Sequence, residues 1–512
     1  METIILISIF ISISTLIITS LLIISHKNKL PPGPSFFSSN FILLTTSLSL
    51  LQTIVKNFKY KYGPLFTLYI GSHPCIFVSS HSVAHELLIQ KGVIFADRPK
   101  TLPVRNISSA LYGPTWRLFR KNLASEILHP SRVKSYAWAR KWVLGILITR
   151  LHNEVDHVGI KVVDHFHYAM FSLLVLTCFG EKLDESHINE IASLQRRWLL
   201  FNGSGGFDIL NLFPKLGKIL FRNRWKELLK LRNDQEKLYI PLIKTRIEGA
   251  SSKSLLIGDE KIVAYVDTLV KIQLPNEDNS NEKGEKLTYK EMVSMCDEFL
   301  NGGTDTTTTA LQWIMANLVK YPRIQSKLFD EIVAVVGPPP QLGEELETVI
   351  NVDEIQKMAY LKAVVLEGLR RHPPGHFVLP HRVMKKVEVE GYVVPEGATI
   401  NFMVAEMGWD PKVWDDPMEF KPERFMENEG VFDISGSKGI KMMPFGVGRR
   451  MCPGYDLALL HLEYFVANMV WYFDWAAPDG YNVDLAEKAE FTVVMKNPLQ
   501  AHVALRAEKL TT

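Results

Sequence analysis

Residues Phe445 to Gly454 read Phe-Gly-Val-Gly-Arg-Arg-Met-Cys-Pro-Gly and place one cysteine, Cys452, in a loop rich in glycine and arginine. The three glycines give the backbone freedom, and an apolar pattern at helical spacing begins at Tyr455. Cys452 therefore lies where a loop enters a helix. Helix N-terminal N–H groups and a nearby arginine both favour a thiolate over a thiol. The pattern predicts a nucleophile or a metal ligand, although it also fits a buried, inert cysteine.

The spacing of Phe445, Gly448, Arg450, Cys452 and Gly454 resembles the haem-thiolate signature of cytochromes P450. This resemblance implies that Cys452 is the axial ligand of a haem b iron and supplies electron density to it. It also implies that Arg450 pairs with a haem propionate and that Phe445 shields the sulfur from water. Backbone N–H groups of the loop would tune the sulfur.

Length and composition fit one large catalytic domain with an anchor. The 512 residues contain no linker rich enough in Pro, Gly or Ser to divide them in half. The formal net charge of +3 comes without a basic run interleaved with aromatic residues, which argues against a nucleic-acid partner. Four scattered cysteines indicate a reducing compartment and no disulfide framework.

The N-terminus predicts a membrane anchor. Residues Ile4 to Ile24 carry no charge and are numerous enough to cross a bilayer as a helix. A cleaved signal peptide is the alternative, but no positive segment precedes the run and no small-x-small cleavage site follows it. Lys27 and Lys29 follow the run, so the positive-inside rule places the rest of the chain in the cytosol. We expect an anchor at 1–29, a stiff proline-rich hinge at 30–40 and the catalytic domain at 41–512.

Most of the chain has helical periodicity, and the resemblance implies the P450 fold, a large helical domain with a small β-rich region. Leu65 to Ile70 and Cys75 to Val78 flank turn residues and predict a β-hairpin. Helices are expected at Ser82 to Gln90, near Tyr112 to Arg120, and at Trp142 to Leu151, with others downstream.

Tyr289 to Val319 has the periodicity of a long helix, with a predicted interruption at Asn301 to Thr307. Two glycines and a run of threonines are poor helix formers, so their presence needs a reason. The stretch resembles the oxygen-binding kink of P450s, in which Asp305 and Thr306 would be the acid–alcohol pair that relays protons. The alternative is a structural kink, with Asp305 capping the following turn.

Further residues receive a role through the resemblance. Trp116 and Arg120, four apart on one helix face, match a pair that contacts a haem propionate in plant P450s. The resemblance makes His381, or otherwise Arg382, a second propionate partner.

Glu367 and Arg370 match the Glu-x-x-Arg pair of the same family, and Arg424 in the segment Phe420 to Phe425 matches its third member. We expect a buried structural network that holds the loop before Cys452. Without the resemblance, the pair would be a surface salt bridge.

Two segments are expected to face the substrate, Gly375 to Leu379 and Phe491 to Met495, and both are mostly apolar. The family places a mobile roof near Phe207 to Phe213, which could equally be a plain surface loop. The segment from Pro99 to Tyr112, which passes over the haem pocket in relatives, is several residues shorter here.

The resemblance covers nearly the whole chain and is greatest to plant microsomal A-type P450s of family 89, through Asn106 to Ser109, Glu126 to Ser131 and Asn401 to Glu406. It implies a monooxygenase of the endoplasmic reticulum membrane that faces the cytosol. Such an enzyme uses O2 and NADPH-derived electrons from NADPH-cytochrome P450 reductase to oxidise an apolar or aromatic small molecule in plant specialised metabolism. Two alternatives remain: a P450-fold isomerase or dehydratase that needs no O2, and a non-catalytic haem-binding membrane protein.

Overall fold

A computed structural model describes most of the catalytic region. The described residues are 30–45, 48–99, 105–154, 159–203, 221–249, 256–257, 260–275, 284–341, 343, 348–426 and 432–509. The predicted anchor at 1–29 and the predicted roof at Phe207 to Phe213 lie outside them. Of the predicted hinge, residues from Phe36 onward are helical, because helix α2 spans Phe36–Thr45.

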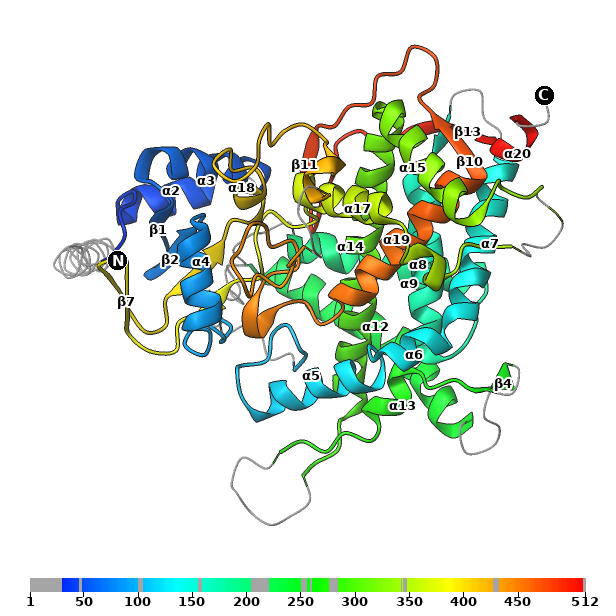
Figure 1. The fold of residues 1–512 in the computed structure, drawn as a ribbon. Coiled ribbons are helices and arrows are strands. Elements are labelled where there is room, and N and C mark those ends of the chain that lie inside the picture. The colour runs from blue at the N-terminus through cyan, green and yellow to red at the C-terminus, as the bar shows by residue number, and fades with distance from the viewer. Residues whose placement is uncertain are drawn as a thin grey trace, which may run out of the picture.

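The molecule has a β-rich part, which contains the N-terminal elements, and a larger helical part (Figure 1). The longer helices are α3 (Leu48–Tyr62), α5 (Pro114–Glu126), α7 (Ala137–Asn153), α8 (Val162–Phe179), α9 (Glu185–Gly203), α12 (Arg222–Gly249), α14 (Tyr289–Lys320), α15 (Pro322–Val336), α17 (Ala359–Arg371) and α19 (Tyr455–Tyr472). The shorter ones are α4 (His81–His85), α6 (Pro130–Ser135), α13 (Tyr265–Leu269), α16 (Val352–Ile355), α18 (Val404–Gly408) and α20 (Arg506–Lys509), together with the π-helical turn η2 (Glu86–Gln90) and the 3-10 turns η3 (Pro422–Phe425) and η4 (Gly448–Arg450). The predicted mainly helical fold is confirmed for the part of the chain that the structure describes.

The main sheet has the order β1-β2-β9-β6 and contains the predicted hairpin. Strands β1 (Leu65–Ile70) and β2 (His73–Val78) are antiparallel, with Leu65 opposite Val78. Strand β9 (Thr399–Phe402) then pairs parallel with β2, and β6 (His381–Arg382) pairs antiparallel with β9. In this sheet His381 pairs with Ile400, and its side chain contacts the Phe95 carbonyl oxygen, 286 positions earlier in the chain.

The remaining strands form small sheets. They are β3 (Ile160–Lys161), β4 (Leu256–Ile257), β5 (Glu260–Lys261), β7 (Val387–Val389), β8 (Tyr392–Val394), β10 (Phe473–Ala476), β11 (Glu487–Ala489), β12 (Val493–Met495) and β13 (Gln500–Leu505). β13 lies between β10 and β3, whereas β4 with β5, β7 with β8 and β11 with β12 form two-stranded pairs.

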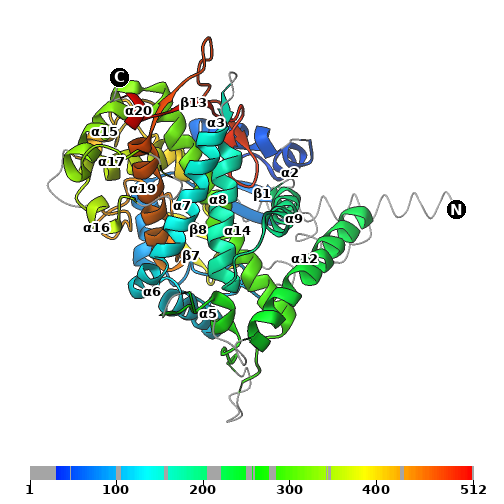
Figure 2. The same cartoon turned by 90° about the vertical axis from the view of Figure 1, so that its right-hand side faces the viewer.

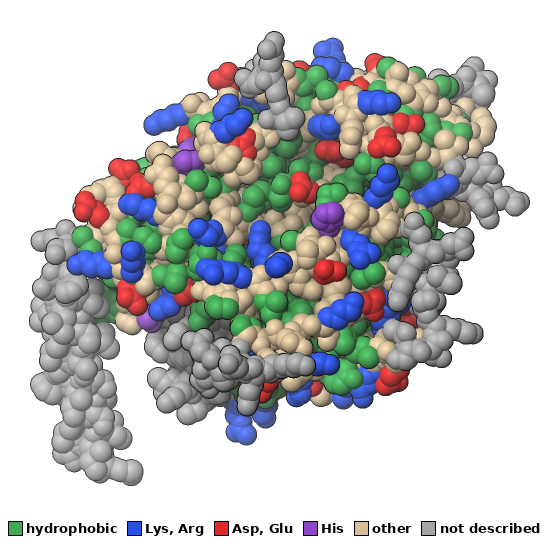
Figure 3. Space-filling view, turned by 60° about the horizontal axis from the view of Figure 1, so that its bottom comes forward, with side chains coloured by type: hydrophobic (Ala, Val, Ile, Leu, Met, Phe, Trp, Pro, Cys, Tyr) green, Lys and Arg blue, Asp and Glu red, His purple; other side chains and the backbone are tan. Residues whose placement is uncertain are grey.

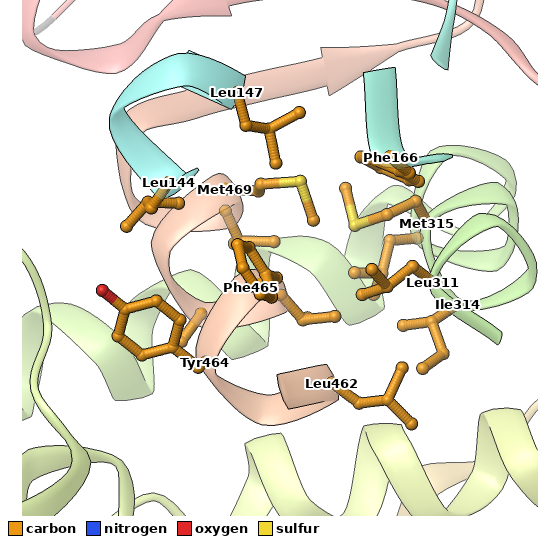
Figure 4. Packing of buried hydrophobic residues seen from close by; sticks show 14 of the residues in the cluster. Leu144, Leu147, Phe166, Leu311, Ile314, Met315, Leu462, Tyr464, Phe465 and Met469 are labelled. Carbon is orange, nitrogen blue, oxygen red and sulfur yellow. The ribbon is translucent and has the colours of Figure 1, made fainter. Parts of the chain in front are cut away.

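The largest core cluster lies among α7, α8, α14 and α19, which run side by side (Figure 2). Leu147, Phe166, Leu311, Phe465 and Met469 meet there, one or two from each helix (Figure 4). Their side chains are almost completely removed from water, and each such burial contributes about 1.5–3 kcal/mol. The core therefore fixes α14, which carries Thr306, and α19, which begins just after Cys452.

Helix α14 is continuous from Tyr289 to Lys320, as the periodicity predicted, and the alternative in which Asp305 caps a new helical turn does not fit it. The helix begins with a capping box, in which the Thr288 and Glu291 side chains accept from each other's backbone N–H groups. The structure supplies a packing reason for one weak helix former. A Cβ atom on Gly303 would lie 2.6 Å from Leu174 Cδ1, so glycine lets α8 approach α14 closely.

Among the described residues, α8 is the helix that is long and apolar enough to cross a membrane. However, 78% of this stretch is buried inside the protein. Helix α8 is therefore a core helix by its packing.

The surface carries charges of both signs. Lys and Arg side chains are spread over the face shown in Figure 3 together with acidic and apolar side chains. This distribution agrees with the small net charge of +3.

Candidate functional site

A large cavity of about 1000 Å³ lies between the cysteine loop and α14. Residues from distant parts of the sequence line it, among them Trp116, Thr306, Phe377, Cys452 and Phe491. Both segments expected to face the substrate contribute to the lining, through Gly375, Phe377, Val378, Leu379, Phe491 and Thr492.

The cysteine loop folds as a tight turn under the cavity. The backbone N–H of Cys452 donates to the Phe445 carbonyl oxygen at 2.9 Å and closes the loop. Gly448 has a φ of 73°, and a Cβ atom there would lie 2.2 Å from the Leu88 carbonyl oxygen, so glycine is required. Gly454 has an ordinary φ of −97°, so the predicted need for backbone freedom is wrong at this position.

Cys452 opens into the cavity just before α19 begins at Tyr455, as predicted. Burial raises the pKa of its thiol, while a hydrogen bond from the Gly454 N–H and the positive charge of Arg120 lower it. The arginine that acts on the sulfur therefore comes from α5. Without a further positive charge, burial outweighs these two effects.

Arg450, Trp116 and Arg120 lie together at one edge of the cavity. The Arg450 guanidinium lies 4.5 Å from the centre of the Trp116 ring, and that of Arg120 lies 5.8 Å from it. Trp116 Nε1 is buried without a hydrogen-bond acceptor in the part of the chain that the structure describes. Arg120 makes no ion pair with the described acidic residues. This edge therefore has donors and positive charge to offer to an anion.

His381 and Arg382, the two predicted propionate partners, differ in their charge and in their hydrogen-bond partners. His381 Nδ1 lies 2.6 Å from the Phe95 carbonyl oxygen, and burial, with repulsion from Arg98 and Arg450, lowers the pKa of the His381 imidazole to about 3. A neutral His381 that donates from Nδ1 has no proton left on Nε2 for a carboxylate. Arg382 already pairs with Asp97 at 3.0 Å.

Arg98 was missed in the sequence, although it lines the same edge. It donates to the carbonyl oxygens of Ser108, Leu379 and Pro380 at 2.8–3.0 Å. Burial, and then the neighbouring Arg450, lower the pKa of Arg98 to about 9, which indicates positive charge without full compensation. The sequence around Arg98, Phe95-Ala96-Asp97-Arg98-Pro99, carries no signal that indicates this role.

Asp305 and Thr306 face different surroundings. Thr306 lines the cavity, and its Oγ1 donates to the Gly302 carbonyl oxygen at 2.7 Å. Asp305 is buried, where its Oδ2 accepts from Thr492 Oγ1 at 2.7 Å. Its Oδ1 lies 3.8 Å from the guanidinium of Arg196, which also pairs with Glu490. Thr492 and Arg196 were not predicted from the sequence.

Glu367, Arg370 and Arg424 form one buried network. Both Glu367 oxygens accept from Arg370, at 2.7 and 2.8 Å, and Arg424 Nε donates to Glu367 Oε1 at 3.2 Å. The arginines then donate to backbone carbonyl oxygens between Gly408 and Glu419. The network thus ties α17 to the segment that leads toward the cysteine loop, and the alternative of a surface salt bridge does not fit it.

The wall from Ile107 to Ala110 belongs to the short segment between Pro99 and Tyr112, of which 100–104 lie outside the described residues. The Glu298 carboxylate accepts from the N–H groups of Ile107 and Ser108 at 2.7 and 2.6 Å. Arg450 donates to the carbonyl oxygens of Ile107 and Ala110. The wall is therefore fixed by charged side chains on two other elements.

The cavity fits a haem. No group of three or more His, Cys, Asp or Glu side chains that could hold a metal ion occurs among the described residues. Among the cavity-lining residues, Arg98, Arg120, Arg450 and the Trp116 N–H suit the carboxylates of a haem. These features define the class of haem-thiolate proteins.

Comparisons with known proteins agree with this class. The family model described as Cytochrome P450 matches residues 31–503, and the chain belongs to the cytochrome P450 family. It is 45% identical to Cytochrome P450 89A9 of Arabidopsis thaliana over 97% of this chain and 98% of that protein, which supports the predicted plant family 89. The chain is thus an oxidoreductase of the cytochrome P450 monooxygenase family in plants.

More distant relatives extend the comparison. The chain is 29% identical to the sarpagan bridge enzyme of Gelsemium sempervirens, over 93% of this chain and 92% of that enzyme. A solved structure of a zebrafish cytochrome P450 with progesterone superposes with a TM-score of 0.70 at 23% identity, over 90% of this chain and 99% of that one. At this identity the structure supports the fold alone.

Proposed function

We propose that the protein is a membrane-bound monooxygenase that transfers one oxygen atom from O2 to a largely apolar or aromatic small molecule in plant specialised metabolism. Electrons would come from NADPH through NADPH-cytochrome P450 reductase. The observation that carries the proposal is the opening of the Cys452 sulfur into a large cavity that Thr306 also lines. When bound, the haem supplies the activation of O2 and the transfer of oxygen.

The residues of the chain would hold the cofactor and its substrate. Cys452 would ligate the iron, and Phe445 would cover the sulfur from the solvent side. Arg98, Arg120, Arg450 and the Trp116 N–H would bind the propionates, with His381 as their neutral neighbour. The apolar residues Phe377, Val378, Leu379 and Phe491 would exclude water from the substrate.

Proton supply would depend on Asp305 and Thr306. Thr306 Oγ1 holds a hydroxyl proton at the cavity wall and would turn from the Gly302 carbonyl toward the reacting oxygen. Asp305 lies behind the wall and connects to the cavity through Thr492, whose hydroxyl donates to it. This proposed route adds Thr492 to the predicted acid–alcohol pair.

We place the protein in the endoplasmic reticulum membrane, with a single span at 1–29 and the catalytic domain in the cytosol. Two side chains of α2 near the start of the described chain support contact with a membrane. Phe37 is 53% exposed and Phe41 69% exposed, which is unusual for phenylalanine in an aqueous environment.

The test is the carbon monoxide difference spectrum of the dithionite-reduced full-length protein in microsomes, beside Cys452→Ser. We expect a red-shifted Soret band in the wild type and its loss in the variant. An O2-independent turnover that needs no NADPH would instead favour an isomerase or dehydratase. No haem signal from well-folded, membrane-inserted protein would overturn the proposed monooxygenase.

A further inference from the structure

A group of polar side chains lies in the cavity wall formed by α12 and α14, away from the two mostly apolar segments that were expected to face the substrate. We call Gln235 on α12 together with Asp297 and Asn301 on α14 the roof cluster. All three line the cavity, and each is at most 8% exposed. Gln195 on α9 lies behind them and is 2% exposed.

The roof cluster has more hydrogen-bonding capacity than its own members use. Asn301 Nδ2 donates to Asp297 Oδ2 at 2.9 Å. Asp297 Oδ1, Asn301 Oδ1 and Gln235 Nε2 are buried without a hydrogen-bond partner among the described residues. Buried polar atoms in native proteins are nearly always paired, and each unpaired one costs about 1–3 kcal/mol. Such a group at a cavity therefore indicates a partner that the protein chain does not supply.

The neighbouring Glu298 shows that incomplete hydrogen bonding is a property of Asp297 and not of buried acidic residues on α14 in general. Both Glu298 oxygens accept hydrogen bonds from backbone N–H groups of the wall. Asp297 accepts one well-formed hydrogen bond, from the Asn301 amide, and Oδ1 has no partner of that quality, although the amides of Gln195 and Gln235 also interact with the carboxylate. Glu298 is therefore held by the backbone of the wall, whereas Asp297 is held by side-chain amides alone.

The pKa of Asp297 is raised to about 7, mainly by burial and also by the nearby Glu298, against the opposing effect of the amides of Gln195, Gln235 and Asn301. A carboxyl group held in this way gains from any additional donor, because a hydrogen bond to the charged form offsets its desolvation. The open atoms of the cluster that line the cavity are two acceptors, Asp297 Oδ1 and Asn301 Oδ1, and one donor, Gln235 Nε2.

The roof cluster is remote from the reacting centre. Asp297 precedes Thr306 by nine residues, which corresponds to roughly 13 Å along the axis of α14. A molecule that contacts both ends of the cavity must therefore carry its polar group far from the carbon atom to be oxidised.

We propose that the roof cluster binds an N–H or O–H group of an otherwise apolar substrate and so positions a distant carbon atom of that substrate beside Thr306. The inference rests on the proposed function and deepens it by naming a substrate class. Asp297 would be a specificity-determining residue that contacts the substrate, with Asn301 as the second acceptor.

The test uses full-length haem-loaded protein and N-alkylimidazoles of increasing chain length, each ending in either a methyl or a hydroxyl group. The imidazole ring anchors one end at the haem iron, and titration of the haem absorption gives Kd. At the chain length that reaches the roof, we expect the hydroxyl-ended probe to have an advantage of about tenfold over the methyl-ended one, relative to short chains.

Asp297→Leu should remove this advantage and leave the binding of the methyl-ended probes unchanged or stronger. The matched control is Asp234→Leu, since Asp234 lies on α12 beside Gln235 but does not line the cavity and pairs with Arg197 at 3.8 Å. This control should keep the advantage. If Asp297→Leu does not fold, Asp297→Asn should reduce the advantage several-fold at pH 8, where Asp297 is charged, because a neutral acceptor binds more weakly than a charged one.

The two proposals fail in different ways. A normal carbon monoxide spectrum with no hydroxyl advantage at any length, or an advantage that survives both Asp297 variants, would overturn the roof cluster as a substrate site and leave water as its partner. Absence of the thiolate-haem band in the wild type would overturn the proposed function, and the inference with it.

Discussion

Asp297 is a buried acidic side chain whose partners are neutral amides, and this has a consequence for stability. Its pKa is raised to about 7 by burial, compared with about 4 for an ordinary aspartate. In the folded state the group holds its proton between these two values, while the unfolded chain has released it. The free energy of unfolding therefore falls as pH rises from about 4 through 7.

We expect Asp297→Asn to abolish this fall in the free energy of unfolding with rising pH, because the amide has a similar shape and does not titrate. At pH 8 the free energy of unfolding of the variant should exceed that of the wild type by about 4 kcal/mol, so the variant should unfold at a higher temperature, and the difference should close toward pH 4. Thermal unfolding at several pH values measures it. A difference that does not change with pH would show that Asp297 titrates normally.

Thr306 is the hydroxyl of α14 that faces both the cavity and the proposed proton route. We expect Thr306→Ala to reduce product by about tenfold or more and to raise peroxide release, because proton delivery fails while electrons still arrive. Product and peroxide per NADPH consumed are the measurements.

The matched control for that experiment is Thr304→Ala on the same helix. Thr304 is buried and does not line the cavity, and its Oγ1 has no hydrogen-bond partner among the described residues. The control should keep the ratio of product to NADPH. Equal uncoupling in both variants would attribute the effect to the helix and not to the Thr306 hydroxyl.

At the scale of elements, the network of Glu367, Arg370 and Arg424 holds α17 against the chain that leads to the cysteine loop. We expect Arg370→Met to cost about 3–5 kcal/mol in the free energy of unfolding, because Glu367 stays buried with one cation fewer. Urea unfolding followed by tryptophan fluorescence measures the loss.

Lys327→Met provides the comparison, since Lys327 pairs with Glu423 at 2.6 Å while about half of its side chain is exposed. Its loss should cost about 1 kcal/mol or less. If both variants lose the same free energy of unfolding, the buried Glu367 network contributes no more to stability than an exposed ion pair.

Helix α14 combines two kinds of constraint along one continuous element. Gly303 is small because α8 lies against it, and Thr306 three residues later faces the cavity. Residues with low helix propensity in this part of α14 can therefore be explained by close packing, as for Gly303, or by a role at the cavity, as for Thr306. Tertiary contacts keep the helix intact where local propensity alone predicts a break.

At the scale of the whole molecule, the local parts of the fold could be predicted from the sequence. The start of α19 at Tyr455, the β1–β2 hairpin and the extent of α14 follow from periodicity and turn residues within short windows. The position of Cys452 under a cavity also followed, because the motif around it is specific.

The parts that could not be predicted depend on contacts between segments far apart in the sequence. Arg196 meets Asp305, and Arg98 meets the carbonyl oxygen of Leu379 281 residues later. Likewise, the open acceptor of Asp297 becomes visible only after α9, α12 and α14 are packed. Charged residues on helices have too many possible partners for spacing to select one.

The hydrogen bonds that hold the backbone of the wall from Ile107 to Ala110 have a further consequence, which concerns how the substrate range of such a pocket changes in evolution. The side chains of Glu298, Arg98 and Arg450 hydrogen-bond to backbone N–H and carbonyl groups of this wall, which nearly every amino acid provides. Mutations can therefore exchange the side chains of the wall while these hydrogen bonds stay in place. Gene copies descended from one ancestor could in this way acquire new substrates by single substitutions without first losing a folded protein.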